Sequence, residues 1–505
     1  MKRLLILSLF IVGLTALYGC QNPIHISETQ ALLEARIPKH INQSFSLPRL
    51  ENAEVEWVYQ DQIIEEAFLY QAPFFDQAIE FNVRVHQGSY EEQFVIKRTL
   101  VAPDSALNVS RIYIETPDQT FDIPRDRNMR ISLQLDTTVN DQNTTIIETD
   151  AVRIRGRGNS TWGMPKKPYR LRFDEAISLL GLPETRTYVL LAEYADKSLL
   201  RNTIVHKFSS RLENLEHTIS TRVVELYMNG EYQGLYVLTE QVELAEEKLF
   251  FETLTGVLDT GYFIEMDQRF FDKGGIEGLT GFVVEGYPYE IVRPDPEHED
   301  YLPEQTAFIK AYFEALEAAL IAKHGYEEYI DVANWIDFFI VQELFKNVDV
   351  GWSSVYIYKK PGDVVRLGPL WDFDLAIGNA DYIDYSPENW YGMRAQKNRW
   401  FKLMMEIPTI REQFKIRYME IYEEILPPFM AELETLYEAK APLARRNFET
   451  WDILGMYVWP NPPEMLRRNT YRHQFEYVKN FIERRADWMY REVQTSRYAS
   501  GRFQP

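Results

Sequence analysis

Cysteine is almost absent from this sequence of 505 residues, which contains Cys20 and no other. One cysteine cannot form an internal disulfide, and the sequence has no Cys/His cluster that would hold zinc. It also lacks the His-Glu-x-x-His pattern of zinc proteases and the Gly-x-Ser-x-Gly turn of serine hydrolases. The sequence therefore points away from a disulfide-bonded body, a zinc enzyme and a serine hydrolase.

Basic residues are few relative to acidic ones. The chain has 54 Lys and Arg against 76 Asp and Glu, a formal net charge of −22 and a pI near 5.0. Nucleic-acid binding needs a surplus of Lys and Arg, so we expect no nucleic-acid partner. The acidity suits a soluble protein, or one whose partners are basic. Hydrophobic residues make up 45% of the chain, enough for a large core.

Long apolar runs are confined to the N-terminus. A basic pair, Lys2-Arg3, precedes an apolar stretch, Leu4 to Leu17, which is short for a membrane-spanning helix. It ends in Leu-Tyr-Gly-Cys, which resembles the lipobox of bacterial lipoproteins. We expect residues 1–19 to be a lipoprotein signal peptide and Cys20 to carry the lipid. The protein would then be anchored in the cell envelope, outside the cytoplasm. An uncleaved anchor and an ordinary secretory signal are the alternatives.

The rest of the chain changes character along its length. Residues 20–44 are polar and suggest a tether. Residues 45–104 contain short alternating strands, which predict a small all-β, immunoglobulin-like sandwich acting as a spacer or binding module. A second β-rich region begins near residue 108, and the chain is mostly helical after about residue 400. The sequence therefore predicts an α+β protein.

Residues 151–174 combine glycine with positive charge. Two predicted strands flank a loop, GRGNSTWG, and a Gly-rich turn lets backbone N–H groups approach phosphate oxygens. Seven basic residues lie within this segment of an acidic protein: Arg153, Arg155, Arg157, Lys166, Lys167, Arg170 and Arg172. The pattern favours phosphate binding. A β-hairpin with solvated basic side chains is the alternative.

A second basic candidate opens a predicted helix. Arg201 and Asn202 lie in the first turn of a helical pattern that begins near Ser198. The N-terminus of a helix and an arginine both favour an anionic ligand. A structural arginine paired with a nearby carboxylate explains the same pattern equally well.

The densest chemistry lies between residues 331 and 377. A predicted helix over 331–346, with Asp331 as its N-cap, ends near Asp349, and a predicted hairpin then leads to Asp372 and Asp374. This layout brings Asp349 and Asp372 to one end of the hairpin. Converging carboxylates are costly unless a cation such as Mg²⁺ lies among them. One aspartate could instead accept the proton of a hydroxyl, as phosphoryl transfer requires. A helix cap with two surface carboxylates is the alternative.

These segments resemble the spore coat protein H (CotH) family of atypical, protein-kinase-like proteins. The matching pieces occur in family order over roughly residues 108–390: RIRGRGNSTW with PKKPYRLRF, DKSLLRN, ELYMNGEYQGLYVLTEQVE, NVD leading to VYIYKK, and GPLWDFDLAIGN. The resemblance implies a two-lobed, kinase-like domain over 108–390, with residues 391–505 as its helical extension. It implies transfer of the γ-phosphate of ATP to Ser or Thr of a protein, with Mg²⁺ or Mn²⁺.

The resemblance also assigns roles to residues. Asp349 corresponds to the catalytic aspartate that orients the acceptor hydroxyl, and Asp372 to a metal-binding aspartate, with Asp374 as a further ligand. Ser354 stands where protein kinases place a metal-binding Asn. The cofactor-binding positions that follow are Lys167 as the phosphate-binding lysine, Arg155 and Arg201 as weaker phosphate contacts, and Glu240 within the segment 238–242 that would hold adenine through its backbone.

Two other classes remain open. A surface assembly or binding protein could keep this fold without the chemistry, and a carbohydrate-active enzyme would also use paired carboxylates. For a kinase, the acidic body favours a basic, Ser-rich protein substrate. A position outside the cytoplasm, where ATP is scarce, leaves the phosphoryl donor open.

Overall fold

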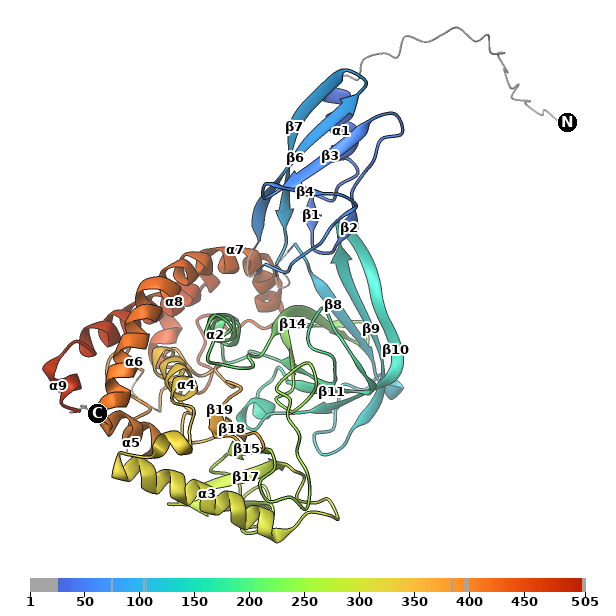
Figure 1. The fold of residues 1–505 in the computed structure, drawn as a ribbon. Coiled ribbons are helices and arrows are strands. Elements are labelled where there is room, and N and C mark those ends of the chain that lie inside the picture. Colours follow the sequence, from blue (N-terminus) through green and yellow to red (C-terminus); the bar gives the residue numbers. More distant parts are fainter. Residues whose placement is uncertain are drawn as a thin grey trace, which may run out of the picture. The chain divides into compact units, whose positions relative to one another are not determined.

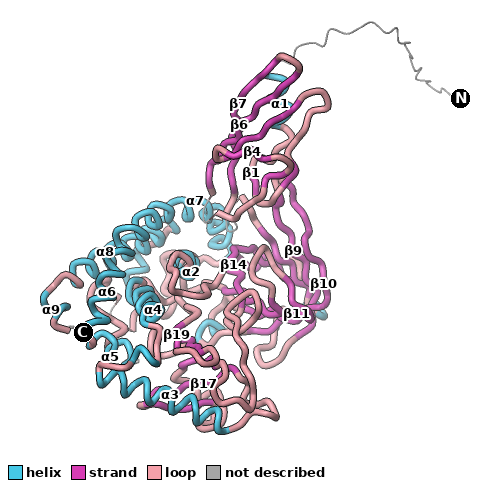
Figure 2. The backbone as a smooth tube through the Cα atoms, viewed as in Figure 1, coloured by secondary structure: helices cyan, strands magenta, loops and turns pink. Residues whose placement is uncertain are grey.

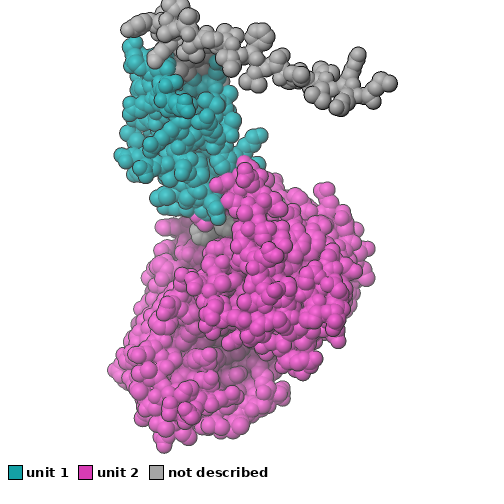
Figure 3. Space-filling model, turned by 90° about the vertical axis from the view of Figure 1, so that its right-hand side faces the viewer, with its two compact units in different colours: residues 1–71, 78–100 teal, residues 72–77, 101–505 magenta. Residues whose placement is uncertain are grey.

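The computed structural model describes residues 26–501 apart from 74–75, 103–104, 106, 383–384 and 395–398. The predicted signal peptide and Cys20 lie outside the described residues. The chain divides into two compact units, residues 1–71 with 78–100 and residues 72–77 with 101–505, which Figure 3 colours separately.

In the part of the chain that the structure describes, the first unit comprises two β-sheets and one helix, α1 (Ile26–Glu34). The five-stranded sheet has the order β1 (His40–Ile41), β7 (Tyr90–Leu100), β6 (Gln77–Gln87), β3 (Glu54–Tyr59), β4 (Gln62–Ile64), and the small sheet pairs β2 (Phe45–Ser46) with β5 (Ala67–Phe68). Along β6, Ile79, Phe81, Val83 and Val85 are buried while residues between them are more exposed. This alternation gives the sheet one core face. The predicted all-β character of this region is confirmed, and its immunoglobulin-like topology stays a prediction.

The second unit begins with a closed β-barrel. Its strands run in the order β10 (Gln142–Gly156), β11 (Tyr169–Ile177), β12 (Thr185–Leu191), β14 (Glu231–Glu240), β13 (Thr221–Met228), β8 (Ser110–Glu115), β9 (Met129–Val139). The pairs are antiparallel except for β8 with β13. Inward-facing residues such as Ile154, Leu171 and Tyr236 form one hydrophobic core. Helix α2 (Arg201–Ser209) lies between β12 and β13 in the sequence.

A second sheet follows in the order β16 (Gly281–Val284), β17 (Tyr287–Arg293), β15 (Tyr262–Met266), β18 (Val355–Lys359), β19 (Val365–Leu367). Helices α3 (Pro303–Ala322) and α4 (Val332–Leu344) join its strands in the sequence. The carboxylate of Asp331 accepts a hydrogen bond from the N–H of Asn334, so the predicted N-cap of α4 is confirmed. The predicted hairpin corresponds to β18 and β19.

The chain ends in helices that share one core with the second sheet. They are α5 (Arg399–Glu406), α6 (Pro408–Glu420), α7 (Leu426–Thr450), α8 (Tyr471–Glu492) and α9 (Ser496–Ala499), with a π-helical turn, Ile421–Ile425, between α6 and α7. Short 3₁₀ turns occur at Pro117–Gln119, Ser160–Gly163, Tyr326–Glu328 and Pro463–Arg467. Within this unit the barrel strands and the C-terminal helices lie on different sides (Figures 1 and 2). The mixed α+β class and the helical C-terminal region are confirmed.

None of the helices within the described ranges is both long and apolar enough to cross a membrane.

One buried ion pair holds the end of α4 to α8. Arg485 Nη2 lies 2.5 Å from Glu343 Oε2, and both side chains have no exposed surface. The same arginine donates to the carbonyl oxygens of Pro387 and Asn389 at 3.1 and 2.6 Å. Glu343 Oε1 accepts the N–H of Tyr391 at 3.0 Å. The pair therefore fixes the loop 387–391 against the helix that leads to Asp349.

We predict that Arg485→Met lowers the free energy of unfolding by about 3–5 kcal/mol, because it leaves the Glu343 carboxylate buried without a positive charge beside it. Denaturant titration followed by tryptophan fluorescence measures this loss. The matched control is Arg186→Met, since Arg186 and Glu175 form an ion pair with side chains 54% and 84% exposed, and its cost should stay below about 1 kcal/mol. Equal losses for the two variants would contradict the role given to Arg485.

Candidate functional site

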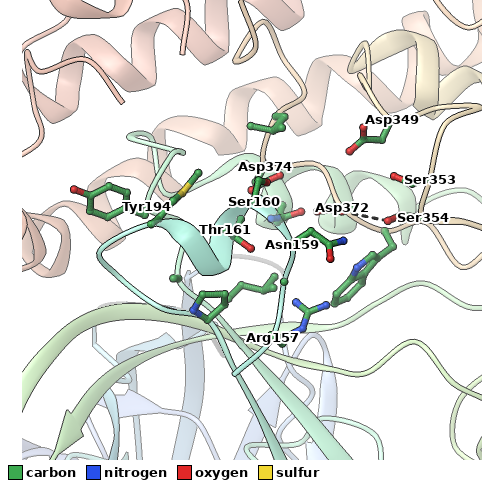
Figure 4. Close-up of a pocket in the computed structure, with 18 of the residues that line it drawn as sticks. Arg157, Asn159, Ser160, Thr161, Tyr194, Asp349, Ser353, Ser354, Asp372 and Asp374 are labelled. Carbon is green, nitrogen blue, oxygen red and sulfur yellow. Dashed lines mark hydrogen bonds between the residues drawn. The ribbon is translucent and has the colours of Figure 1, made fainter. Parts of the chain in front are cut away.

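The largest concentration of polar and charged groups lines a cleft of about 940 Å³ in the second unit. One wall is the loop after β10, another is the segment around Asp349, and a third is the segment 371–375 (Figure 4). The structure therefore brings together motifs that lie about 200 residues apart in the sequence.

The glycine-rich loop is shaped by close packing at two positions. A Cβ at Gly156 would overlap the indole of Trp162, and a Cβ at Gly158 would overlap the hydroxyl of Thr161. Gly158 also has a φ of +85°, which favours glycine. The N–H of Gly156 donates to Pro124 O at 2.8 Å. These contacts hold the backbone of the loop close to the cleft.

Arg155 and Arg157 bring positive charge from this loop into the cleft. The guanidinium of Arg157 lies 5.5 Å from the ring centre of Trp371. Burial lowers the pKa of Arg157, while the nearby carboxylates of Asp372 and Asp374 act in the opposite direction. Arg157 belongs to the basic cluster seen in the sequence but was not singled out there. In the structure, Arg157 is the arginine of the loop that lies near the carboxylates of Asp372 and Asp374, which we call the acidic wall together with Asp349 and Glu193.

The predicted carboxylates Asp349, Asp372 and Asp374 all line the cleft. The N–H of Asp349 donates to Asn347 Oδ1 at 3.1 Å, which shapes the turn after α4. Ser354 Oγ donates to Asp372 Oδ2 at 3.2 Å (Figure 4). Ser354, which stands at the position of the kinase Asn, therefore orients Asp372 directly.

Glu193 is a fourth carboxylate of the cleft, and the sequence analysis missed it. It follows β12, and its Oε1 accepts a hydrogen bond from Asn202 Nδ2 at 2.8 Å. Its Oε2 is buried without a hydrogen-bond partner among the described residues. Burial, and next the charge of Asp196, raise the pKa of Glu193 to about 8. The sequence pattern that could have identified Glu193 is a glutamate just after a predicted buried strand, nine residues before Asn202.

The acidic wall carries more negative charge than its surroundings balance. Burial raises the pKa of Asp374 well above its ordinary value, and Asp372, Glu193 and Asp349 raise it further. Within the described part of the chain, no group of three or more His, Cys, Asp or Glu is already arranged to hold a metal ion. The donor chemistry nevertheless fits a hard divalent cation, because Asp372 and Asp374 line the same cleft as Glu193, whose Oε2 has no hydrogen-bond partner among the described residues.

Three predicted cofactor-binding side chains do not line the cleft. Lys167 Nζ donates to Trp162 O at 2.7 Å, and its neighbour Lys166 is the lysine at the cleft. Lys166 is itself buried and donates to Leu235 O and to Asn447 Oδ1, at 2.5 and 2.9 Å. Burial lowers the pKa of Lys166 to about 7. The side chain of Lys167 is thus directed toward Trp162, and its role in binding phosphate stays a prediction.

Arg201 also has a structural role. Its side chain has no exposed surface and lies 2.5 Å from Asp196. Its Nε donates to Ala376 O at 3.0 Å and its Nη2 to Ile377 O at 3.3 Å. The structure thus supports the alternative of a structural arginine, and Arg201 holds the segment that follows Asp374.

Glu240 faces away from the cleft. Its Oε1 accepts the N–H of Ser220 at 2.9 Å, and Gln241 is the residue of the segment 238–242 that lines the cleft. The contact of the segment 238–242 with adenine through its backbone stays a prediction, and the side chain of Glu240 does not line the cleft.

Exposed aromatic residues surround the mouth of the cleft. Tyr382 and Trp459 are stacked with ring centres 6.4 Å apart, and each is about half exposed. Trp352, which is 48% exposed, follows Asp349 closely and its N–H donates to Asp349 O at 2.8 Å. Because Trp459 comes from the chain between α7 and α8, the C-terminal helical region contributes to the site.

A charged network lines the cleft near Asp349. Asp267 has no exposed surface and binds Arg269 Nε at 3.0 Å and the ammonium of Lys273. Glu265 is half-buried beside them, and Asp267 first and Asp349 next raise the pKa of Arg269. Arg269 and Lys273, whose charges are paired with Asp267, therefore lie on the side of the cleft that holds Asp349.

Comparison with known proteins identifies the family of this chain. The family model described as CotH kinase protein matches residues 152–489, which is most of the chain. The chain therefore belongs to the CotH kinase family, as the ordered motifs predicted. The match continues beyond residue 390 through most of α8, so the C-terminal helices are part of the family domain. No curated protein matches the sequence.

We predict that Gly156→Ala disrupts the glycine-rich loop, because the added methyl group overlaps the Trp162 ring. Gly163→Ala is the matched control in the same loop, since a Cβ there meets no atom within 4 Å. Binding of a fluorescent ATP analogue should weaken at least about tenfold in Gly156→Ala, a loss of about 1.4 kcal/mol. It should stay near the wild-type value in Gly163→Ala. Equal affinities for both variants would show that the loop does not touch the nucleotide.

Glu265 should make stability depend on pH. Burial raises its pKa from 4.5 to about 7, although Lys273 opposes this shift. Between these values the folded protein binds more protons than the unfolded chain, so the free energy of unfolding falls as pH rises.

In Glu265→Gln this fall should be smaller by up to about 3 kcal/mol across that window. Denaturant titrations at several pH values measure it. Glu175→Gln, at a carboxylate 84% exposed, should keep the wild-type slope. If the free energy of unfolding of Glu265→Gln fell with pH as steeply as that of the wild type, the raised pKa would not belong to Glu265.

Proposed function

We propose that this protein is a protein kinase that transfers the γ-phosphate of ATP to Ser or Thr residues of a protein substrate. The observation that carries the proposal is the single cleft in which a basic, Gly-rich loop faces Asp349, Asp372 and Asp374. Membership of the CotH kinase family supports the same activity. In this view the barrel and the part that follows it act as the two lobes of a kinase-like fold.

The acidic wall would hold the divalent metal. Asp372, Asp374 and Glu193 supply the carboxylate oxygens that Mg²⁺ or Mn²⁺ prefers. When bound, the ion would offset the negative charge of the ATP phosphates and of the carboxylates. Ser354 and Asn202 have orienting roles, since they donate hydrogen bonds to Asp372 and Glu193.

The loop would bind the other end of the triphosphate. Its backbone N–H groups can approach phosphate oxygens because residues 156 and 158 lack a Cβ. Arg157 and Arg155 add positive charge on that side, and the segment 238–242 would hold adenine through its backbone. Positioning and electrostatics then supply most of the rate.

Asp349 would orient the acceptor hydroxyl and accept its proton. It lies across the cleft from the loop, on a turn fixed by Asn347. The exposed Trp352, Tyr382 and Trp459 at the mouth offer apolar contacts for a polypeptide beside it. A basic, Ser-rich substrate would suit the negative charge of the body.

The lipoprotein signal and Cys20 would place this kinase at a bacterial membrane, outside the cytoplasm. The phosphoryl donor would then be ATP that reaches that compartment. A kinase-fold binding protein is the second candidate, because no metal group is already formed in the described residues.

Phosphotransfer decides between these candidates. Purified protein with γ-labelled ATP, Mg²⁺ or Mn²⁺ and a basic Ser-rich peptide should label the peptide or itself. Asp349→Asn should lower the rate about 10²–10⁴-fold while nucleotide affinity stays unchanged. Asp372→Asn should weaken metal-dependent nucleotide binding as well.

Asp272→Asn, at an exposed carboxylate outside the cleft, is the matched control and should keep full activity. Metal-dependent nucleotide binding without any transfer would favour the binding protein. Absence of both binding and transfer would refute the kinase.

A further inference from the structure

A second large groove lies on α8, in a part of the molecule that the proposed chemistry does not use. Its volume is about 960 Å³. The lining comes from α8, from the 3₁₀ turn at Pro463–Arg467 and from the loop at 385–387. None of its residues lines the cleft that holds Asp349.

The groove collects positive charge in an acidic protein. Arg467, Arg468 and Arg484 line it together with His473. Within the described residues, neither Arg467 nor Arg484 has an ion-pair partner. In a chain with a net charge of −22, this is a local excess of positive charge that the protein does not balance itself.

The acidic residues of the groove do not cancel this excess. Two glutamates line it, Glu464 and Glu476. Glu476 already pairs with Arg472, whose Nη2 lies 2.5 Å from Glu476 Oε1. Three arginines therefore face one remaining carboxylate, and an anionic ligand would complete the groove.

The shape of the groove fits an extended chain better than a single small anion. Its lining residues on α8 run from His473 to Arg484, on one face of the helix. Eleven residues of helix rise about 16 Å, which is the length of about five residues of extended peptide. Tyr477 lies between the charged ends and is partly exposed, whereas Phe481 beside it is buried in the core.

The floor of the groove is tied to the segment that follows Asp374. The hydroxyl of Tyr477 donates to Gly378 O at 3.0 Å, and a Cβ at Gly378 would overlap that hydroxyl. The guanidinium of Arg468 lies 4.1 Å from the ring centre of the same tyrosine. A chain bound in the groove would therefore rest on a tyrosine that contacts Gly378.

We propose that this groove binds an acidic peptide segment of a partner protein, with carboxylates or phosphates at Arg467 and Arg484 and an apolar contact at Tyr477. The site is independent of phosphotransfer. A partner with an acidic segment for the groove and a basic segment for the cleft would contact both charged surfaces of this protein.

Fluorescence anisotropy tests the groove with a labelled oligoglutamate peptide and the full-length protein. Wild type should bind the peptide, and added salt should weaken binding because the charges are exposed. Arg467→Glu/Arg484→Glu should weaken binding at least about tenfold, because it replaces two attractions by two repulsions. Thermal unfolding should not change, since both side chains are exposed.

The matched control is Lys402→Glu/Arg445→Glu, which changes the net charge equally at two exposed positions outside the groove. Its affinity should remain within about twofold of wild type. Equal weakening by both double variants would reduce the binding to non-specific attraction and overturn the proposal. Unlabelled peptide should displace the labelled peptide more effectively than inorganic phosphate does, when both competitors are compared at equal concentrations of negative charge. Equal displacement by phosphate would overturn the proposal that the groove binds a peptide.

Discussion

The buried ion pair between Arg201 and Asp196 connects the chain segment that carries Glu193 with the segment that carries Asp374. Asp196 belongs to the chain just after Glu193, and Arg201 donates to the carbonyl oxygens of Ala376 and Ile377, just after Asp374. Both side chains are completely buried, so neither charge can be solvated if the other is removed. The relative position of Glu193 and Asp374 therefore depends on an interaction that contacts no ligand.

Burial explains why the groups of the cleft have unusual proton affinities. The carboxyls of Glu193 and Asp374 have raised pKa values for the same first reason, which is loss of contact with water. Arg157 and Lys166 show the opposite shift from the same cause. A cleft in which both acids and bases are held toward their neutral forms gains stability when a charged ligand and its counter-ion enter together.

The sequence predicted the parts of the site that depend on order and local pattern. The cap at Asp331 and the hairpin that follows α4 are local features, and they explain why Asp349 and Asp372 could be expected at one place. The sequence did not indicate that Lys166 lines the cleft while Lys167 does not, because neighbouring side chains point to different sides of the backbone. Glu193 was missed because its role depends on its burial and on Asn202, which spacing alone does not reveal.

The C-terminal helices were predicted as an extension, and their contribution to the cleft was not. Trp459 reaches the mouth from a loop almost 90 residues beyond Asp372, and no local pattern encodes such a contact. Likewise, the role of Arg485 follows from the burial of Glu343 in the folded protein. Long-range packing is the information that periodicity and motif spacing lack.

The hydrogen bonds of Asn447 have a consequence for how this domain can be cut. Its Oδ1 accepts from Lys166 and from the N–H of Leu235, so α7 satisfies two polar groups of the barrel. A truncation that ends before α7 would leave both donors without this acceptor in a dry interior. The barrel and the helices lie in one compact unit, and a fragment without α7 would need other partners for these two donors.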